Sequence, residues 1–596
     1  MRTRSLFLTV AFLGLALGLV LAGFQARVHA PAPSVDPGPI GDPGPSPTPD
    51  VPMPQPDPLL EPYRQLAAAI QDRDIAVLSQ LAARTDGVAY HAHLALARFY
   101  RERGESARAN THYAEALSRW VDPAVRREHA ASLEQAGDVA GALAAWTLLL
   151  PDSAAVEAIG GLADPPAAAA AYRRARLHQA AFQVVQKDTT PAGVLERARA
   201  QAALRDFAGA VADFSTYLRI RPDDAQARAE YALALERNRQ FDAALAEYGK
   251  LDAAGHAGRG RVLQAQGRTT EAIEAFLSSA DAEARWRGAQ LLELAGNTNR
   301  ALQVYTELAA SAARVADDAA LRAYLIQARA GRDAASGQFS ARLTPGLAYL
   351  AGTFTGHWPA MGPVAPLLPP ALDVANALAR DYGMDWARIE VEVALRGAAP
   401  GQQIAIGQWF LEQGLYNRAA WIGMSLLPQL PAPEVYRLAY PRAYEELVLA
   451  ASARYQVDPL LVWAVMREES HFQPSVMSWA DARGLMQVIP STGAWIAQKL
   501  GEEFVLEQLF DAATSIRYGA WYLSYLLDTY GGDVTAAVAA YNGGPGSVNR
   551  WRSSPLYRDP VDLPGVATFQ ETREYIGKVL ASWLAYRWIY GTGSGL

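Results

Sequence analysis

Two adjacent glutamates, Glu468 and Glu469, end an apolar run that is typical of a buried helix. A carboxylic acid in apolar surroundings keeps its proton to a higher pH than usual, and a general acid needs this property. Enzymes that cleave glycosidic bonds commonly pair such an acid with a second carboxylate. The nearest downstream candidate is Asp481, twelve residues after Glu469. The segment therefore raises two questions: which glutamate could act as the acid, and whether it has a partner.

The helix that carries the two glutamates has a clear beginning. Asp458 is a favoured N-cap residue, and Pro459 fits the first helical position. At about 100° per residue, Glu469 falls in the middle of the apolar arc and Glu468 lies nearer its edge. Glu469 also lies in the last turn, where the negative end of the helix dipole opposes ionisation. Both arguments favour Glu469, and a solvated pair of glutamates at a helix end is the alternative.

The residues around Glu469 belong to a pattern that continues towards the C-terminus. The first motif, E-S…P…S…G-L-M-Q…P-x-T, lies between Glu469 and Thr492. It is followed by A-Y-N-G-G-P-G at 540–546 and by E-T-R-E-Y at 571–575. These ordered motifs resemble the signature of the soluble lytic murein transglycosylases, whose lysozyme-like catalytic domain belongs to glycoside hydrolase family 23. Together they span most of residues 441–590.

The resemblance implies a role for each residue that matches the motifs. Glu469 would be the sole catalytic acid and base. The residues expected to bind substrate are Ser478, Gln487, Tyr541, Asn542 and Glu571. Ser478 and Gln487 would contact the sugar ring that bears the N-acetyl group. Tyr541 would lie near the acid, and Glu571 would bond to sugar or position the acid.

Structural interpretations of the same side chains stay open at this stage. Ser478 could cap a turn, and Gln487 could tether the backbone. Tyr541 could be a core aromatic, and Glu571 could be a charge favoured at a helix N-terminus.

The resemblance also implies a mechanism that needs one carboxyl group and neither a metal nor a cofactor. In peptidoglycan, the acetamido group of N-acetylmuramic acid would supply the nucleophile, and a 1,6-anhydro ring would form without water. Asp481 departs from the family pattern, which commonly has a small residue there, and so does Arg483. We expect Asp481 to be a surface charge in a turn. If Asp481 instead acts as a second catalytic carboxylate, the protein would be a lysozyme-type hydrolase. A further alternative is a scaffold that binds peptidoglycan without cleaving it.

The region from about residue 60 to 430 is rich in Ala, Leu and Arg and has helical periodicity. A spacing G-x4-A-x3-aromatic recurs in it. Copies begin at Gly104, Gly137, Gly267 and Gly296, and two degenerate copies begin at Arg205 and Arg239. Such a period predicts paired helices with the glycine at the turn and the alanine at their close approach. The array resembles tetratricopeptide-type repeats, and we expect a scaffold, with the docking of glycan strands or other cell-wall proteins as the alternative.

Composition limits the class of protein further. The chain has 596 residues and a formal net charge of −7, and this negative charge argues against nucleic acid as a partner. It has no cysteine, which excludes thiol catalysis and Cys-ligated zinc. His91 and His93 do not share a helix face, so we expect packed or surface histidines and no metal. The N-terminus has the layout of an export signal, with an uncleaved membrane anchor as the alternative. We therefore expect a protein of the periplasm or cell envelope.

The expected organisation is mainly α-helical. Residues 1–30 would be the signal or anchor, 31–60 a Pro-rich linker, 61–440 a tetratricopeptide-like superhelix, and 441–596 a lysozyme-like, mostly helical catalytic domain.

Overall fold

The computed structural model describes residues 57–356, 358, 361–478 and 480–591. The expected export segment and most of the Pro-rich linker lie outside these residues. From Asp57 onwards the chain forms one compact unit. No helix within the described ranges is long and apolar enough to cross a membrane.

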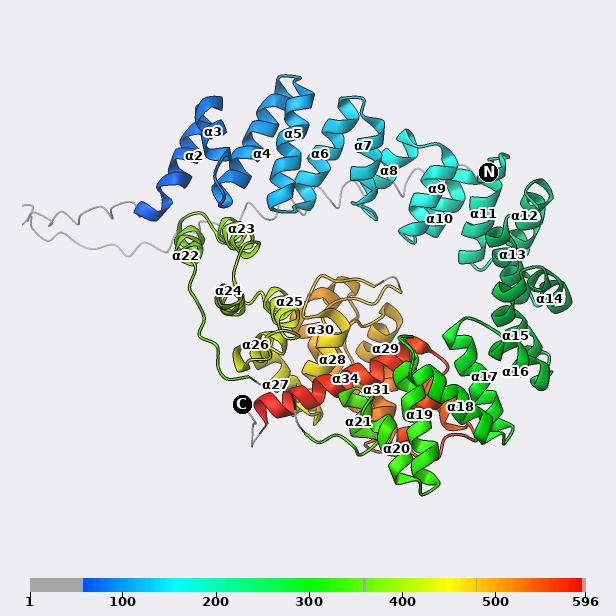
Figure 1. The fold of residues 1–596 in the computed structure, drawn as a ribbon. Helices are drawn as coiled ribbons and strands as arrows, with labels where there is room; N and C mark the ends of the chain where they lie inside the picture. Colours follow the sequence, from blue (N-terminus) through cyan, green and yellow to red (C-terminus); the bar gives the residue numbers. More distant parts are fainter. Residues whose placement is uncertain (1–56, 357, 359–360, 479, 592–596) are drawn as a thin grey trace, which may run out of the picture. The chain divides into compact units, whose positions relative to one another are not determined.

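The described chain is built from helices that follow one another in close pairs (Figure 1). The first series is α2 (Glu61–Gln71), α3 (Ile75–Ala82), α4 (Gly87–Glu102), α5 (Ser106–Arg119), α6 (Pro123–Gln135), α7 (Val139–Thr147), α8 (Ser153–Leu162), α9 (Pro165–Arg174), α10 (His178–Val185), α11 (Pro191–Ala203), α12 (Phe207–Ile220), α13 (Ala225–Arg237), α14 (Phe241–Gly249), α15 (His256–Ala265), α16 (Thr269–Leu277), α17 (Ala282–Leu294), α18 (Thr298–Ala309), α19 (Ala316–Arg329) and α20 (Asp333–Ser340). It continues as α21 (Pro345–Leu350), α22 (Ala371–Asp381), α23 (Met384–Leu395), α24 (Pro400–Glu412), α25 (Tyr416–Leu426) and α26 (Pro433–Ala439). The mainly helical fold class is confirmed.

The predicted turns of the repeats are confirmed by the backbone. Gly104, which separates α4 from α5, has a φ of +74°, and the three other motif glycines take similar positive values. Arg205 and Arg239 stand at the equivalent turns with φ of +65° and +61°. A left-handed conformation costs a residue with a Cβ about 1 kcal/mol, so the degenerate copies keep the turn at an energetic cost. The turn geometry, rather than the glycine itself, is what the repeats share.

The alanine and aromatic positions of the repeat form the core of the array. The motif alanines are fully buried, as are several of the aromatic rings. These residues are Ala109, Ala142, Ala210, Ala244, Ala272 and Ala301, with Tyr113, Phe214 and Tyr305. A methyl side chain lets two helices approach closely, and the ring from the paired position fills the remaining space.

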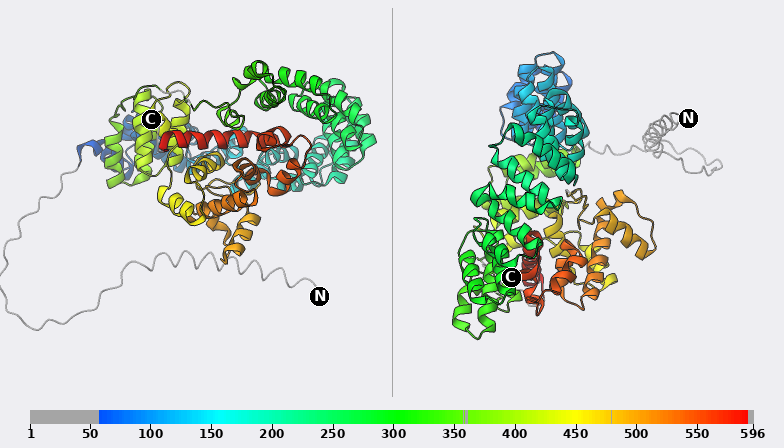
Figure 2. Two further views of the ribbon diagram at one scale, coloured as in Figure 1. Left: turned by 90° about the horizontal axis from the view of Figure 1, so that it is seen from below. Right: turned by 90° about the vertical axis from the view of Figure 1, so that its right-hand side faces the viewer.

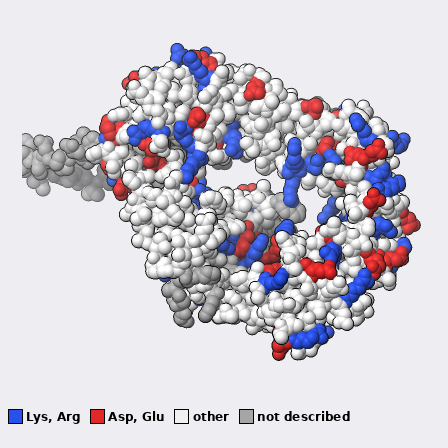
Figure 3. All heavy atoms as spheres, in the orientation of Figure 1, with Lys and Arg blue, Asp and Glu red and all other residues white. Residues whose placement is uncertain are grey.

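Ion pairs between successive helices add to this packing. Examples are Arg197 with Asp213 and Arg228 with Glu247, and Arg300 of α18 pairs with Glu274 of α16, two helices earlier. Figure 3 accordingly shows basic and acidic side chains next to each other along this part of the surface. The first helices also share a hydrophobic core with α22 to α26. There the Tyr63 hydroxyl donates to Glu390 at 2.6 Å.

The C-terminal helices enclose a separate large core. They are α27 (Glu445–Tyr455), α28 (Pro459–Ser470), α29 (Pro490–Leu500), α30 (Ala512–Thr529), α31 (Val534–Gly543), α32 (Pro545–Arg552), α33 (Leu563–Val566) and α34 (Gln570–Tyr590), with 3-10 turns at Leu506–Phe510 and Pro560–Asp562. Two further 3-10 turns, at Pro58–Leu60 and Asp252–Gly255, belong to the first series of helices. The turn between α26 and α27 covers residues 440–444.

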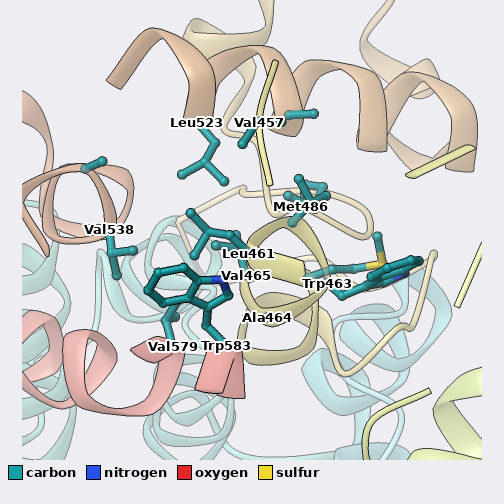
Figure 4. Packing of buried hydrophobic residues seen from close by; sticks show 14 of the residues in the cluster. Val457, Leu461, Trp463, Ala464, Val465, Met486, Leu523, Val538, Val579 and Trp583 are labelled. Carbon is teal, nitrogen blue, oxygen red and sulfur yellow. The ribbon is translucent and has the colours of Figure 1, made fainter. Parts of the chain in front are cut away.

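Helix α28 lies at the centre of this C-terminal core. Its residues from Leu461 to Met466 are at most 1% exposed, as its all-round apolar sequence predicts. Figure 4 shows Leu461, Trp463, Ala464 and Val465 in one cluster with Leu523 of α30, Val538 of α31 and Val579 of α34. Burial of each large side chain contributes about 1.5–3 kcal/mol. The long helix α34 lies beside α28 (Figures 1 and 2), so the end of α28 is held from several sides.

Candidate active site

Glu469 lies in the last turn of α28. At the other end of this helix, Asp458 accepts the Leu460 N–H at 2.9 Å and the Trp583 indole N–H at 2.7 Å, so the predicted N-cap is confirmed. The Tyr575 hydroxyl of α34 donates to Glu469 Oε1 at 2.6 Å. The catalytic candidate is thus oriented by the helix that packs beside its own.

The surroundings of Glu469 favour its protonated form. The pKa of Glu469 is raised to about 8, chiefly by burial, and the neighbouring carboxyl groups of Glu468 and Glu571 contribute to this rise. The hydrogen bond from Tyr575 acts in the opposite direction and lowers this pKa. No ion pair to Glu469 occurs in the described part of the chain. A carboxylic acid that holds its proton near neutral pH can act as a general acid.

Glu468 has a different environment from its neighbour. Arg467 donates to Glu468 Oε1 at 2.5 Å, and the Ser582 hydroxyl of α34 donates to the same oxygen at 2.6 Å. The Arg467 Nε donates to the Ala439 carbonyl at 3.0 Å. This polar network ties α28 to α34 and uses the Glu468 carboxylate as a structural group.

One pocket brings the sequence-predicted site residues together. Its volume is about 550 Å³. It is lined by Glu469, Ser478, Gln487, Tyr541, Asn542 and Glu571, together with Tyr522, Thr492, Phe569 and Thr572 and the backbone around Gly543 and Gly544. Side chains from four separate segments therefore converge on one acid, which is the arrangement of an active site.

Two of the predicted residues also hold the loop that forms one wall. Ser478 Oγ accepts the backbone N–H groups of Ala480 at 3.2 Å and Ala482 at 3.0 Å, so it caps a turn. The Gln487 amide nitrogen donates to the carbonyls of Val476 at 3.2 Å and Gly484 at 2.9 Å. The structural interpretations of both side chains are therefore correct. These bonds leave the Ser478 hydroxyl proton free to donate to a ligand and the Gln487 amide oxygen free to accept from one.

The other wall comes from α31 and α34. The Tyr541 hydroxyl donates to the Met486 carbonyl at 2.9 Å, and burial followed by the charge of Glu469 raises the pKa of Tyr541 well above its ordinary value. Asn542 Oδ1 accepts a hydrogen bond from Thr572 at 2.6 Å. Glu571 is exposed in the first turn of α34, where the helix dipole favours its negative charge.

Asp481 lies outside the pocket. Its φ is +62°, its side chain is half exposed, and it accepts a hydrogen bond from Arg483 Nε at 2.9 Å. It is therefore a surface charge in a turn. Among the described residues, Glu571 is the carboxylate that joins Glu469 in lining the pocket.

Sequence reasoning missed Tyr575. Its motif was recognised, but Tyr575 itself received no role. The available signal was its position four residues after Glu571, because residues at this spacing share one face of a helix.

Position 484 in the first motif requires glycine for a steric reason. Its φ is +74°, and a Cβ there would lie 1.9 Å from the Leu509 carbonyl oxygen. Any larger residue would displace the loop that carries Gln487.

Comparison with known proteins finds similarity in the C-terminal helices. A family model described as the transglycosylase SLT domain matches residues 446–559. We refer to helices α27 to α34, which contain this match, as the SLT domain. Its sequence is similar to the soluble lytic murein transglycosylase of Escherichia coli K12, with 33% identity over 155 residues, 26% of this chain and 24% of that protein. It is also similar to the membrane-bound lytic murein transglycosylase C of Salmonella arizonae, with 35% identity over 166 residues, 24% of this chain and 46% of that protein.

These alignments span about a quarter to a half of the relatives' length. A comparison of structures finds the 70 kDa soluble lytic transglycosylase of Escherichia coli, with 18% identity and a TM-score of 0.46 over 89% of this chain and 86% of that one. Within this chain, the SLT match ends before α34, so Glu571 and Tyr575 lie beyond it.

Proposed function

We propose that this protein is a lytic transglycosylase that cleaves the β-1,4 bond between N-acetylmuramic acid and N-acetylglucosamine in peptidoglycan without water. One observation carries this proposal. Glu469 is a partly buried carboxyl group that lacks a cationic partner in the described chain, holds its proton near neutral pH and lines a pocket of hydrogen-bonding side chains. The similarity of residues 446–559 to the transglycosylase SLT domain, and of this region to lytic murein transglycosylases, supports peptidoglycan as the substrate class.

The reaction proceeds in two proton transfers on the same carboxyl group. Glu469 donates its proton to the glycosidic oxygen while the acetamido oxygen of the muramyl ring attacks C1, and the sugar beyond the bond leaves as an alcohol. The Glu469 carboxylate then takes the proton from the C6 hydroxyl, whose oxygen attacks C1 and displaces the acetamido oxygen. The product is a 1,6-anhydro ring, and Glu469 is protonated again.

The side chains around Glu469 have supporting roles in this proposal. The Tyr575 hydroxyl stabilises the carboxylate between the two proton transfers. Gln487 and Ser478 offer an amide oxygen and a hydroxyl to the ring that bears the acetamido group. Tyr541 and Glu571 orient the sugar from the opposite wall, and Asn542, held by Thr572, completes that wall.

The wider setting of the reaction is part of the same proposal. The protein acts in the periplasm or cell envelope, exported or anchored through its N-terminal segment. It uses residues 441–596 for catalysis and residues 61–440 as a scaffold that other cell-wall proteins can contact. Its substrate is the glycan strand of peptidoglycan, and neither nucleic acid, metal nor cofactor takes part.

Digestion of purified sacculi tests the chemistry directly. Mass spectrometry of the released muropeptides should find anhydro ends, which are one water lighter than reducing ends. Products with reducing ends would instead identify a lysozyme-type hydrolase. If neither the wild type nor Glu469→Gln digests the sacculi, the result would favour a scaffold that only binds glycan.

The hydrolase remains a second candidate because Glu571 lines the same pocket as Glu469. Two carboxyl groups flanking a bond are the usual hydrolytic arrangement. Glu571→Gln separates the two reactions. The variant should keep the anhydro product at a reduced rate if Glu571 only binds sugar. It should lose cleavage as completely as Glu469→Gln does if Glu571 is a nucleophile or base.

A further inference from the structure

Arg573 is a buried arginine that links the SLT domain to the helical array. It lies in the first turn of α34, next to Thr572, which lines the pocket, and two residues before Tyr575, which bonds to Glu469. Its residue surface is 1% exposed. The third motif of the sequence contains Arg573, yet neither the pocket nor the proposed reaction uses it.

All three nitrogens of this guanidinium have acceptors, and two of the acceptors belong to the array. Nε donates to Asp318 of α19 at 2.7 Å, and Nη2 donates to Glu283 of α17 at 2.5 Å. Nη1 donates to the Ala567 carbonyl at 3.0 Å. The guanidinium also lies 5.5 Å from the centre of the Trp286 ring of α17. A buried cation needs such partners, so the position of Arg573 depends on the array.

Besides Arg573, the hydrogen bond from Thr572 to Asn542 holds the first turn of α34, but the helix has no side-chain cap. Its N-cap residue, Phe569, makes no capping hydrogen bond through its side chain, and the first backbone N–H groups of a helix have no partners within the helix. The same turn and the next carry Glu571, Thr572 and Tyr575. Because a helix moves as a rigid body over such a short distance, a shift of Arg573 displaces all three.

We propose that Asp318 and Glu283 are positioning residues for the reaction. They hold Arg573, and Arg573 holds the start of α34 in the place where the Tyr575 hydroxyl meets Glu469. The array is then a structural part of the active site as well as a scaffold. This inference deepens the proposed transglycosylase activity and rests on it.

Helix α19 offers a matched control. Arg322, one turn after Asp318, forms a second buried ion pair with Asp562 at 2.6 Å. Both residues are at most 1% exposed, and the pair joins the array to the segment before α33. Asp562→Asn therefore disturbs the same contact between array and domain without touching Arg573. If Asp318→Asn acted only by lowering the stability of the protein, Asp562→Asn would change hydrogen exchange and catalysis in the same way.

The test compares full-length wild type, Asp318→Asn, Asp318→Glu and Asp562→Asn by two measurements. Hydrogen exchange followed by mass spectrometry reports the order of residues 570–576, and peptidoglycan digestion over a range of pH reports catalysis. In Asp318→Asn, exchange in 570–576 should rise at least about tenfold and kcat should fall at least about tenfold, with KM changed less than about twofold. Asp318→Glu should restore part of both.

The pH profile adds a readout that a purely structural role would not move. Loosening the hydrogen bond from Tyr575 removes an effect that lowers the pKa of Glu469, so the alkaline limb of the profile should move to higher pH in Asp318→Asn. Glu468, Glu571 and Tyr541, the other titratable groups facing Glu469, stay unchanged in this variant. Asp562→Asn should keep the wild-type profile.

Two results would overturn the inference. The first is that hydrogen exchange in residues 570–576 of Asp318→Asn stays as in the wild type. The second is that Asp318→Asn and Asp562→Asn lose kcat equally and that both keep the wild-type pH profile of cleavage. If Asp318→Asn does not fold, Glu283→Gln replaces it, because Glu283 is more exposed; the same shifts, smaller in size, are expected. A wild type that cleaves no peptidoglycan would refute the proposed activity, while the exchange measurement would still decide whether Asp318 positions α34.

Discussion

Two carboxyl groups in this molecule, those of Asp562 and Glu469, have opposite chemistry. At the contact between array and SLT domain, Asp562 is fully buried and accepts hydrogen bonds from Arg322 and Arg329. Burial alone would raise the pKa of Asp562, but the arginines and backbone N–H groups lower it overall. In the pocket, Glu469 has the Tyr575 hydroxyl as its hydrogen-bond partner, and its pKa rises to about 8.

The difference shows how one protein uses buried carboxyl groups for structure and for chemistry. A carboxylate that meets two arginines and backbone N–H groups, as Asp562 does, keeps its charge and fixes the position of Arg322. An unpaired one avoids the cost of a buried charge by keeping its proton, which makes it an acid. Glu468 and Glu469 repeat the contrast at adjacent positions, because Arg467 pairs with the first and not with the second.

The largest expected effect comes from removing the acid. Glu469→Gln keeps the shape of the side chain but has no proton to donate, so the rate of peptidoglycan cleavage should fall about 10³-fold. Release of soluble muropeptides from sacculi measures this rate. Retention of more than a tenth of the wild-type rate would remove Glu469 from the mechanism.

The opposite kind of effect is expected from Asp562→Asn. The change removes the charged partner that Arg322 and Arg329 share and leaves them Glu293 and Asp559, so the free energy of unfolding should fall by about 3 kcal/mol. Denaturant unfolding followed by circular dichroism measures it. A loss below about 1 kcal/mol would show that the two carboxyl groups differ less than their contacts indicate.

The protonation of Glu469 should also appear in the pH dependence of stability. Because its folded pKa of about 8 lies above the ordinary value of 4.5, the folded state keeps a proton that the unfolded chain releases. The resulting stability is complete below pH 4.5 and is lost as the pH rises through about 8.

Glu469→Gln stays neutral at every pH and should lose none of this stability. It should therefore exceed the wild type at pH 9 by on the order of 3 kcal/mol, allowing for solvent in the pocket, and match it near pH 4.5. Thermal unfolding at a series of pH values measures the difference. Parallel curves for the two proteins would show that Glu469 is ionised at neutral pH.

A smaller effect is expected from Tyr575→Phe, which removes the hydroxyl that bonds to Glu469. The pKa of Glu469 should rise and the carboxylate formed during the reaction should lose a donor. Cleavage should slow about tenfold, and its alkaline limb should move to higher pH.

Tyr586→Phe is the matched control for this change. Tyr586 lies on the same helix, is fully buried, and donates its hydroxyl to the Pro441 carbonyl at 2.9 Å, away from Glu469. It should alter stability and leave the pH profile in place. Equal profiles for both variants would contradict the role assigned to Tyr575.

The smallest effect is expected from Asp481→Asn. The side chain is exposed and its ion pair with Arg483 is screened by water, so stability should change by less than about 0.5 kcal/mol and the cleavage products should stay the same. A change of product from anhydro to reducing ends, or a large loss of rate, would return Asp481 to the active site.

The sequence by itself determined the local features of this protein. Helix periodicity and the Asp458–Pro459 start located α28 and distinguished Glu469 from Glu468, because the side a residue faces on a helix follows from its spacing. The repeat spacing placed Gly104 and its equivalents at turns for the same reason: each turn depends on a few neighbouring residues.

Only the tertiary structure decided which distant groups meet. Tyr575 reaches Glu469 across 106 positions, and Arg573 meets Asp318 across 255 positions. No periodicity within one segment carries information about such a pair, since its geometry depends on how whole helices pack. The same holds for the second carboxylate of the pocket: Asp481 is nearer to Glu469 in sequence, but packing of α34 beside α28 brings Glu571 into the pocket instead.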